Sequence, residues 1–377
     1  MKVLFITHYA SLTSGSNRSM LQLIKELKNN YKVDINVLLP KKGELCDELR
    51  LIDVPFFVMH YWPYKFENRS LRHLPKMLFN FISIGRLFHI FKKNNYDIIH
   101  INSSVLDIGV YLKLFKKTKH IMHFREYGEF DYHLIPYWGY KYESFVYKHV
   151  DCGIAISKSI RDYYLEKDVC CKLKLIYNGI KIPNLKYISK HNNSVIQFCC
   201  IGFICKTKNQ KIIIDAINYL VNVLNVSDFH LNILGTADEV YLEQLKQIIC
   251  NNNLHQYITF HGYISQPSEL LSSYDVGIMS SISEAFGRVT VEYLLHSLPV
   301  IASKCGANME IVKERKNGLF FELNDVEGLA QCMNFFIKNK KQMVQMGKWG
   351  KEDAESRFSS VANTAHIYNL YTDIITK

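Results

Sequence analysis

The sequence predicts an α/β protein with two domains, each built around a doubly wound parallel sheet. Short apolar runs of strand length alternate along the chain with segments in which apolar residues recur at helical spacing. The chain has 377 residues, which is more than one hydrophobic core usually supports. The polar segment from Lys186 to Ser194 separates two such series and indicates a linker. We therefore expect an N-terminal domain over residues 1–185, a second domain over 194–355 and a C-terminal helical segment over 356–377.

The first domain opens with the apolar run Val3–Ile6, a loop that contains Gly15, and a helix from about Ser19 to Leu27. A strand, a glycine loop and a helix in this order are typical of the start of a doubly wound unit. The loop lacks a Gly-x-Gly-x-x-Gly pattern, so it does not indicate a plain dinucleotide site. Further strands of this domain are expected at 34–39, at 96–102, from residue 119 and at 151–157.

In the second domain the apolar runs that predict strands lie at 194–202, 231–235, 258–264, 275–279 and 300–302. Helices are expected between them, at about 211–224, 239–251 and 269–274, from 289 to the helix-ending Pro299, and from 326 onward. A last helix is expected over 361–375, because Ile367, Leu370 and Tyr371 lie along one side of it.

Composition narrows the class of protein. The formal net charge is +11, which suits an anionic substrate or an anionic membrane face, and no nucleic-acid-binding motif accompanies it. The apolar run at the start is too short for a signal-peptide core, and nowhere do 18 apolar residues run without a charge. Ten cysteines occur without a Cys-x-x-Cys pair. We expect a cytoplasmic protein with reduced thiols, peripheral at the inner face of the cell membrane if it meets a membrane at all.

Residues 71–93 form the most membrane-like segment. Apolar residues recur there at helical spacing, and basic residues surround them (Met77, Phe81, Ile84, Phe88 and Phe91; Lys76, Arg86, Lys92 and Lys93). Such a helix lies flat on an anionic leaflet or covers a sheet while its basic side chains reach water. The sequence leaves both alternatives open.

The stretch from Ser280 to Glu310 carries the densest pattern. A strand ends in serines, Glu284 follows, and the tight Ala-Phe-Gly segment leads into a helix that contains Glu292. The first amides of a helix have no partner within it, and together with the helix dipole they favour an anion. A plainer alternative is that Glu284 only favours a helix start and that Glu292 pairs with Arg288 four residues before it.

The ensemble of motifs resembles the family 4 (group 1) glycosyltransferases. It comprises Glu284-Ala-Phe-Gly-Arg-Val-Thr-Val-Glu292, Ser297-Leu-Pro-Val-Ile-Ala-Ser303, Gly306, Glu310-Ile-Val and Asn317-Gly-Leu-Phe320. The resemblance covers nearly the whole chain. It implies the GT-B fold, two Rossmann-like domains facing across a cleft, and a terminal helix that crosses back to the first domain. It also implies a retaining enzyme of the bacterial surface-polysaccharide type that transfers a sugar from a nucleotide diphosphate sugar to a hydroxyl of a glycan or lipid-linked glycan.

For the first domain, the resemblance implies a donor-diphosphate loop at Gly15, with Arg18 on the acceptor side. The strand from residue 119 delivers a His-x-Arg-Glu pattern at its end. His123 is the expected catalytic contact to the donor sugar, and Arg125 and Glu126 are expected on the acceptor side. His120 is the competing candidate for the catalytic histidine.

For the second domain, the resemblance implies that Lys208 binds the donor diphosphate. The family's arginine is replaced by Phe203, so Lys206 is the expected substitute charge unless the donor is held differently. Around the donor we also expect Glu284 on the sugar hydroxyls and as a second catalytic residue, Glu292 on the ribose, and the group Tyr263, Ile264, Phe286, Gly287, Arg288 and Val289.

No Asp-x-Asp triplet occurs in the sequence, so no metal site and no cofactor are expected. Lysine charge and helix amides would then stabilise the departing diphosphate. The expected partners are a nucleotide sugar and a glycan or lipid-linked acceptor, with no nucleic acid. Three alternatives remain: a hydrolase that uses the two carboxylates, a nucleotide-sugar epimerase of the same fold, and a non-catalytic partner protein that has kept the fold.

Overall fold

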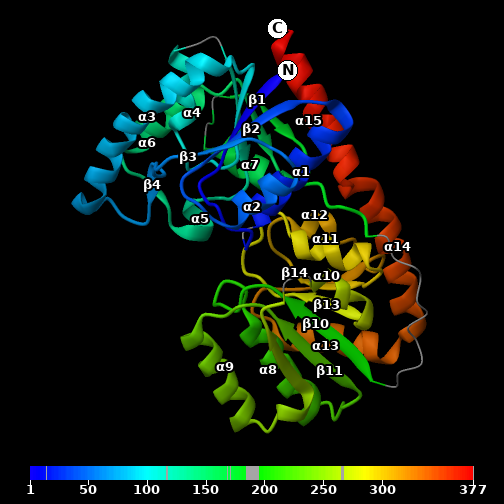
Figure 1. Cartoon of the computed structure of the whole chain (residues 1–377). Coiled ribbons are helices and arrows are strands. Elements are labelled where there is room, and N and C mark those ends of the chain that lie inside the picture. The colour runs from blue at the N-terminus through cyan, green and yellow to red at the C-terminus, as the bar shows by residue number, and fades with distance from the viewer. Residues whose placement is uncertain are drawn as a thin grey trace. The chain divides into compact units, whose positions relative to one another are not determined.

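The computed structural model describes residues 1–13, 15–115, 118–167, 169, 171–183, 195–264 and 267–376, and the expected linker from Lys186 to Ser194 lies outside them. The chain divides into two compact units. The first unit comprises Met1–Lys181 and Ser360–Lys377, and the second comprises Ile182–Ser359. Figure 1 shows that each unit is a sheet with helices packed on it.

A parallel seven-stranded sheet forms the centre of the first unit, in the order β3-β2-β1-β5-β6-β8-β9. Its strands are β1 (Lys2–Ile6), β2 (Asp34–Leu39), β3 (Phe56–Val58), β5 (Ile98–Ile101), β6 (Lys119–Phe124), β8 (Cys152–Ala155) and β9 (Leu173–Leu175). A separate antiparallel pair joins β4 (Lys65–Phe66) to β7 (Ile135–Pro136). The central strands are buried on both faces, which explains why they are nearly continuous apolar runs.

The second unit contains a parallel six-stranded sheet in the order β12-β11-β10-β13-β14-β15. Its strands are β10 (Ile196–Ile201), β11 (Phe229–Leu234), β12 (Ile258–Gly262), β13 (Val276–Met279), β14 (Val300–Ser303) and β15 (Gly318–Phe321). In both sheets the chain order reverses beside the first strand, as in doubly wound folds. The predicted fold class is confirmed.

Helices connect the strands in each unit. The first unit holds α1 (Gly15–Tyr31), α2 (Glu44–Leu51), α3 (Leu74–Asn94), α4 (Ile108–Phe115), α5 (Glu129–Tyr132), α6 (Tyr140–Lys148), α7 (Lys158–Glu166) and α15 (Ser360–Ile375). The second holds α8 (Gln210–Asn222), α9 (Glu239–Asn251), α10 (Pro267–Leu270), α11 (Arg288–Leu295), α12 (Asn308–Ile311), α13 (Val326–Lys338) and α14 (Lys340–Phe358). Three single turns of 3-10 helix lie at Leu71–His73, His255–Tyr257 and Leu271–Ser273.

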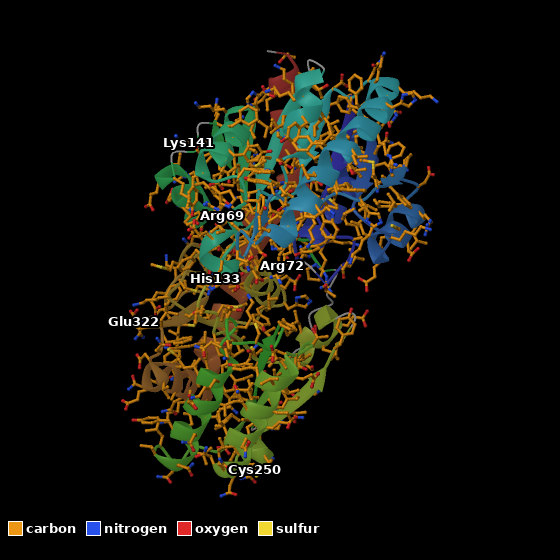
Figure 2. All side chains as sticks on the ribbon, turned by 90° about the vertical axis from the view of Figure 1, so that its left-hand side faces the viewer. Arg69, Arg72, His133, Lys141, Cys250 and Glu322 are labelled. Carbon is orange, nitrogen blue, oxygen red and sulfur yellow. The ribbon has the colours of Figure 1, made fainter. Side chains whose placement is uncertain are left out.

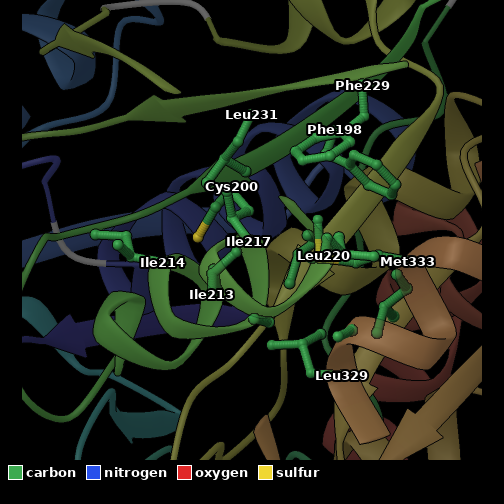
Figure 3. Packing of buried hydrophobic residues seen from close by; sticks show 14 of the residues in the cluster. Phe198, Cys200, Ile213, Ile214, Ile217, Leu220, Phe229, Leu231, Leu329 and Met333 are labelled. Carbon is green, nitrogen blue, oxygen red and sulfur yellow. The ribbon is translucent and has the colours of Figure 1, made fainter. Parts of the chain in front are cut away.

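Side-chain packing between sheet and helices stabilises each unit. In the second unit, Ile213, Ile217 and Leu220 of α8 turn towards the strands that carry Phe198 and Leu231 (Figure 3). All five side chains are buried. Complete burial of an aliphatic or aromatic side chain contributes roughly 1.5–3 kcal/mol.

Helix α1 begins at Gly15, four residues earlier than expected from the sequence. The side chain of Asn17 is fully buried and donates hydrogen bonds from Nδ2 to the carbonyl oxygens of Tyr9 and Ser11. These bonds hold the preceding loop against the first turn of the helix. Gly15 and Arg18 therefore lie in the first turn of α1 and not in the loop before it.

Helix α3 shares features of both alternatives raised for residues 71–93. Met77, Leu87 and Phe91 are buried against the unit. Leu78, Phe81 and Ile82, however, expose more than half of their surface. None of the helices in the described ranges is both long enough and apolar enough to cross a bilayer.

The last two helices belong to different units. Helix α14 packs on α11 in the second unit, and α15 packs on α1 in the first. In α15 the buried side chains of Ile367, Leu370 and Tyr371 join the core beneath β1 and β2. The segment expected over 356–377 therefore begins within α14, and the chain passes from the second unit to the first at Ser359–Ser360.

Candidate functional site

In parallel α/β sheets, ligands bind beyond the carboxyl ends of the strands. In the second unit the segments that follow β10 and β13 leave this edge and meet. The Nζ atom of Lys208 lies 2.8 Å from Oε2 of Glu284. The lysine side chain keeps 34% of its surface exposed and the glutamate 13%. The structure thus brings together the lysine and the first glutamate that the sequence predicts for the donor.

Three further hydrogen bonds hold these two segments in place. Ser280 donates from Oγ to the carbonyl oxygen of Lys208 at 2.7 Å, and Ile282 donates its amide to the carbonyl oxygen of Thr207 at 3.0 Å. Oε1 of Glu284 accepts the amide of Gly287 at 3.0 Å. The pair between Lys208 and Glu284 is therefore fixed by backbone as well as by charge.

Gly287 precedes α11 in a left-handed conformation, with φ at +77°. A glycine adopts this conformation without the steric penalty of a β-carbon. The first amides of an α-helix have no acceptor within the helix, and together with the helix dipole they favour an anion at the start of α11. The ring of Phe286 is buried and contacts Phe358 edge-on, so only its backbone remains available to a ligand, while Val289 is half-buried.

Glu292 forms an ion pair within α11. Nε of Arg288 lies 2.9 Å from its Oε1, and both side chains keep about a fifth of their surface exposed, 22% and 18%. This is the plainer arrangement considered from the sequence. A pair this exposed contributes little to stability, about 0–1 kcal/mol, so a ligand can replace either partner at low cost.

The remaining residues of the second unit that were predicted to bind the sugar nucleotide are more exposed to solvent. Phe203 exposes half of its surface directly after β10, and Lys206 is exposed two residues before Lys208. Tyr263 and Ile264 follow the edge strand β12, where Tyr263 is 56% exposed.

Two glycines bring β10 and β11 together at this edge. A β-carbon on Gly235 would meet the carbonyl oxygen of Gly202 at 1.9 Å, and both glycines have positive φ. Only glycine fits at Gly235. The close approach keeps the backbone at this edge free of side chains.

In the first unit, Arg125 and His123 form a buried network at the end of β6. Arg125 donates from Nε to Oδ1 of Asn102 at 2.7 Å and from Nη1 to Oδ1 of Asn178 at 2.6 Å. Its Nη2 donates to Nδ1 of His123 at 3.2 Å. His123 also contacts Nε2 of His100 at 3.0 Å. Burial, followed by the charge of Arg125, holds the pKa of His123 well below its usual range, so this imidazole is neutral.

Glu126 follows Arg125 in the sequence, and its carboxylate is hydrogen-bonded to the residues that follow β5. Its Oε1 accepts hydrogen bonds from Oγ of Ser103 and from the amide and hydroxyl of Ser104, at 2.7 to 2.9 Å. Such a carboxylate is held in place by its donors. Burial also lowers the pKa of His8, although the charge of Glu126 opposes this effect.

The competing histidine, His120, lies near the start of β6. Its backbone amide donates to Asp151, and its ring packs against Gly109 of α4. Because it is three residues from His123 along a strand, its side chain points to the opposite face of the sheet. Of the two histidines, His123 lies nearer the carboxyl end of β6, the edge at which parallel α/β sheets bind ligands.

Gly15 is exposed at the first position of α1, and Arg18 donates from Nε to the carbonyl oxygen of Leu12 at 2.7 Å. Arg18 therefore stabilises the loop before the helix.

Sequence reasoning did not select the residues that position His123 and Arg125. They are Asn102, Asn178, His100 and Tyr371. Asn178 belongs to an Asn-Gly pair that is also typical of a turn, and Tyr371 to the apolar stripe of a helix, so neither carried a separate signal. Within the described residues, no three His, Cys, Asp or Glu side chains are grouped closely enough to hold a metal ion.

Both units match models of glycosyltransferase families. Residues 182–353 match the model described as "Glycosyl transferases group 1", and residues 13–182 match "Glycosyltransferase Family 4". Together the two models span almost the whole chain.

Individual relatives match over most of their length. The chain is 25% identical over 397 aligned residues to the UDP-Gal:alpha-D-GlcNAc-diphosphoundecaprenol alpha-1,3-galactosyltransferase of Escherichia coli, covering 97% of this chain and 95% of that protein. It is 24% identical to the capsular polysaccharide biosynthesis glycosyltransferase CapH of Staphylococcus aureus, covering 81% and 82% of the two chains.

Among solved structures, HepE of Anabaena in complex with UDP superposes with a TM-score of 0.81 at 21% identity, covering 99% of this chain and all of that one. A likeness at this identity establishes a shared fold. Taken with the two family models and the motif from Glu284 to Glu292, it completes the assignment: the chain belongs to the glycosyltransferases of group 1 and family 4, with the GT-B fold.

Proposed function

We propose that this glycosyltransferase moves a sugar from a nucleotide diphosphate sugar to a hydroxyl of a glycan or lipid-linked glycan, with retention of configuration and without a divalent metal ion. The observation that carries the proposal is the partly exposed ion pair between Lys208 and Glu284, held beside the start of α11. A lysine, a helix N-terminus and a carboxylate in one place suit a diphosphate and the hydroxyls of the sugar attached to it.

The donor is a uridine diphosphate sugar in this proposal. The Escherichia coli relative is named for UDP-galactose, and HepE structures are described with UDP and with UDP-glucose. The acceptor belongs to a capsule, an O-antigen or an exopolysaccharide, because relatives are named for capsular and lipopolysaccharide synthesis.

Each side chain has a role that its chemistry allows. Lys208 neutralises the diphosphate, and the positive end of the α11 dipole favours its oxygens. Glu284 accepts hydrogen bonds from the donor sugar, and Glu292 accepts them from the ribose. His123 contacts the sugar near the reacting carbon. Retention follows if the acceptor attacks from the face that the diphosphate leaves, with the departing phosphate taking the acceptor proton.

The proposal of metal independence depends on which groups of the protein stabilise the departing diphosphate in place of a metal ion. The departing diphosphate must be stabilised electrostatically, and the sequence contains no Asp-x-Asp triplet of the metal-binding type. Lys208 and the start of α11 supply positive potential at one place. Activity should therefore survive EDTA, and complete loss on chelation that magnesium restores would contradict this part of the proposal.

The decisive test is binding of nucleoside diphosphates by calorimetry, followed by transfer assays with the sugar nucleotides whose bases bind. Lys208→Met should weaken UDP binding about thirtyfold, because one charged contact to phosphate is lost. Lys211→Met is the matched control, since Lys211 is an exposed lysine of the same unit paired with Asp215. Equal effects of the two substitutions would contradict the role of Lys208.

A non-catalytic role is the second candidate, and Phe203 favours it. This exposed aromatic residue stands where the family has a phosphate-binding arginine. A protein that has lost the activity need not bind nucleotides. Absence of binding by every nucleoside diphosphate would therefore support this candidate over the transferase.

We also propose peripheral contact with an anionic membrane through one surface of the first unit. The surface combines exposed apolar side chains of α3 and of the turn before it with exposed aromatic side chains that follow β6 (Leu71, Leu78, Phe81 and Ile82; Phe130, Tyr132, Trp138 and Tyr140). Arg69, Arg72 and Lys141 are exposed in the same unit and are labelled in Figure 2. Arg69, two residues before Leu71, contacts the segment after β6, since its Nε donates to the carbonyl oxygen of Pro136 and its guanidinium lies over the ring of Tyr140.

Sedimentation with vesicles tests this contact. Binding should require anionic lipid and fall with salt, because the basic residues act through a screened field. The combined change Leu78→Ser and Ile82→Ser should reduce binding severalfold. Val223→Ser with Val240→Ser is the control, because these residues are equally exposed in the second unit. Binding that ignores lipid charge, or that both variants retain, would overturn the proposal.

A further inference from the structure

A chain of three side chains leads from the C-terminal helix to His123. The hydroxyl of Tyr371 on α15 contacts Nδ1 of His100 on β5, and Nε2 of His100 lies 3.0 Å from Nδ1 of His123 on β6. All three residues are buried, with exposed fractions of 0%, 0% and 1%. The ring of His100 stacks on Phe5 at 4.7 Å and meets Tyr371 edge-on, so it is fixed from two sides.

The hydrogens of such a chain can run in either of two directions. Either Tyr371 donates to His100, which donates to His123, or His123 donates to His100, which donates to Tyr371. Arg125 decides between them. Its Nη2 faces Nδ1 of His123 at 3.2 Å, and a guanidinium has donors only. Nδ1 of His123 must therefore accept, and the hydrogens run from Tyr371 to His100 to His123.

This direction places the ring hydrogen of His123 on Nε2. That atom is buried and has no hydrogen-bond partner within the described residues. A buried donor without an acceptor costs roughly 1–3 kcal/mol. Unsatisfied groups of this kind are rare in folded proteins, and at the carboxyl end of a parallel strand a ligand oxygen is the natural acceptor.

We propose that His100 and Tyr371 are positioning residues of the transfer reaction, which hold His123 as a neutral donor that offers its Nε2–H to an oxygen of the glycosyl donor. The proposal rests on the proposed function for the identity of the ligand. It assigns His123 no role as a base, because the N–H groups of Arg125 and His100 share the one lone pair of Nδ1 and Nε2 already carries its hydrogen. Burial and the charge of Arg125 keep the pKa of both histidines well below the usual value, so neither imidazole changes charge near neutral pH.

The arrangement of hydrogens is tested without any activity assay. Nitrogen-15 NMR of protein labelled at histidine distinguishes the two neutral forms of each ring, and the spectra of His123→Gln and His100→Gln assign the signals. Both residues should carry hydrogen on Nε2 alone, unchanged from pH 8 to pH 6. A signal from His123 with hydrogen on Nδ1, or on both nitrogens at pH 7, would overturn the proposal.

The role in catalysis is tested with Tyr371→Phe, which removes only the hydroxyl that orients His100. We expect a mixture of the two neutral forms at His100, kcat reduced about five- to tenfold and KM for the sugar nucleotide changed less than twofold. Tyr368→Phe is the control, since Tyr368 lies on the same helix and stacks on Tyr31. Unchanged histidine spectra and kcat in Tyr371→Phe, or equal losses in both variants, would contradict the assignment.

Two substitutions at His123 separate a donor from a base. Glutamine keeps an N–H near the position of Nε2, whereas phenylalanine keeps only the bulk. His123→Gln should retain at least tenfold more activity than His123→Phe, and its rate should depend on pH as that of the wild type does. Equal losses would refute the role of donor. If the wild type transfers no sugar at all, the proposed function fails, while the wild-type spectra still decide the hydrogen arrangement.

Discussion

The polar clusters at the carboxyl edges of the two sheets are built in opposite ways. In the first unit, Arg125 is 7% exposed and each of the three nitrogens of its guanidinium is hydrogen-bonded to a neighbour of the same unit. In the second unit, Lys208 is a third exposed and forms an ion pair with Glu284. One cluster is part of the core, and the other lies at the surface.

This difference teaches what each cluster can do. A buried network around a charged arginine holds geometry and cannot release a partner without leaving a charge unsatisfied. A partly exposed ion pair contributes less and exchanges its partner for a ligand more easily. We therefore expect changes in the first cluster to affect stability and activity together, and changes in the second to affect ligand handling alone.

Arg125→Met should produce the largest effect on stability. The substitution removes the buried donor to Asn102 and Asn178 and one of the two donors to His123, and we expect a loss of about 3 kcal/mol of unfolding free energy. Urea denaturation followed by circular dichroism measures it. Arg50→Met, at an exposed arginine paired with Asp47, is the control and should change stability by less than about 1 kcal/mol. Similar losses in both variants would remove the contrast between the clusters.

Glu284→Gln should lower kcat by about 100- to 1,000-fold, because the proposed role of Glu284 places its negative charge near the donor sugar. That charge would stabilise the positive charge that develops on the sugar in the transition state. Stability should change by only about 1 kcal/mol, since the amide oxygen of glutamine still accepts from Gly287. Glu322→Gln, at an exposed residue of the same unit paired with Lys304, is the control and should leave turnover unchanged. A variant that unfolds instead of losing turnover would place Glu284 with the structural cluster.

Buried histidines of the first unit should make its stability sensitive to acid. Burial lowers the pKa of His120 to about 4 from an unfolded value of 6.5. The unfolded chain therefore binds the proton first as the pH falls, and the stability that this residue contributes is present above pH 6.5 and declines below it. Between pH 7 and pH 5 the loss is about 2 kcal/mol. His120→Gln should flatten the pH dependence of urea denaturation by that amount, and an unchanged slope would show that His120 titrates alike in both states.

Phe203→Arg should have the smallest effect, and it should strengthen ligand binding, whereas the other substitutions cause losses. It places a guanidinium in the same segment after β10 as Lys208, and we expect UDP binding to tighten about two- to tenfold. Val223→Arg adds the same charge at another exposed position of the unit and should change binding by less than twofold. Calorimetry compares the two. Weaker binding in Phe203→Arg would mean that the aromatic ring itself contacts the donor.

The fold was predictable from the sequence because strands buried on both faces leave long apolar runs and because the helix patterns are regular. Helix α9, for example, has the predicted bounds 239–251. The start of α1 was not predictable, since it depends on Asn17 reaching back to carbonyl groups of the preceding loop. Local propensity does not contain such a contact.

The candidate site divides in the same way. Lys208 and Glu284 lie in dense motifs, and the structure pairs them. His100 and Tyr371 are 271 residues apart in sequence, and their contact arises only when α15 folds onto the first sheet. From the sequence, a tyrosine in the apolar stripe of a helix is interpreted as a core residue. The contact of the Tyr371 hydroxyl with His100 is evident only in the folded structure.

The return of α15 also affects how the protein is made. The first unit is assembled from the beginning and the very end of the chain, and Ile367, Leu370 and Tyr371 complete its core. During synthesis on the ribosome, the second unit can finish folding while the first still lacks this helix. A polypeptide that lacks α15 therefore leaves the core of the first unit incomplete, and the first unit can finish folding only after the second has been synthesised.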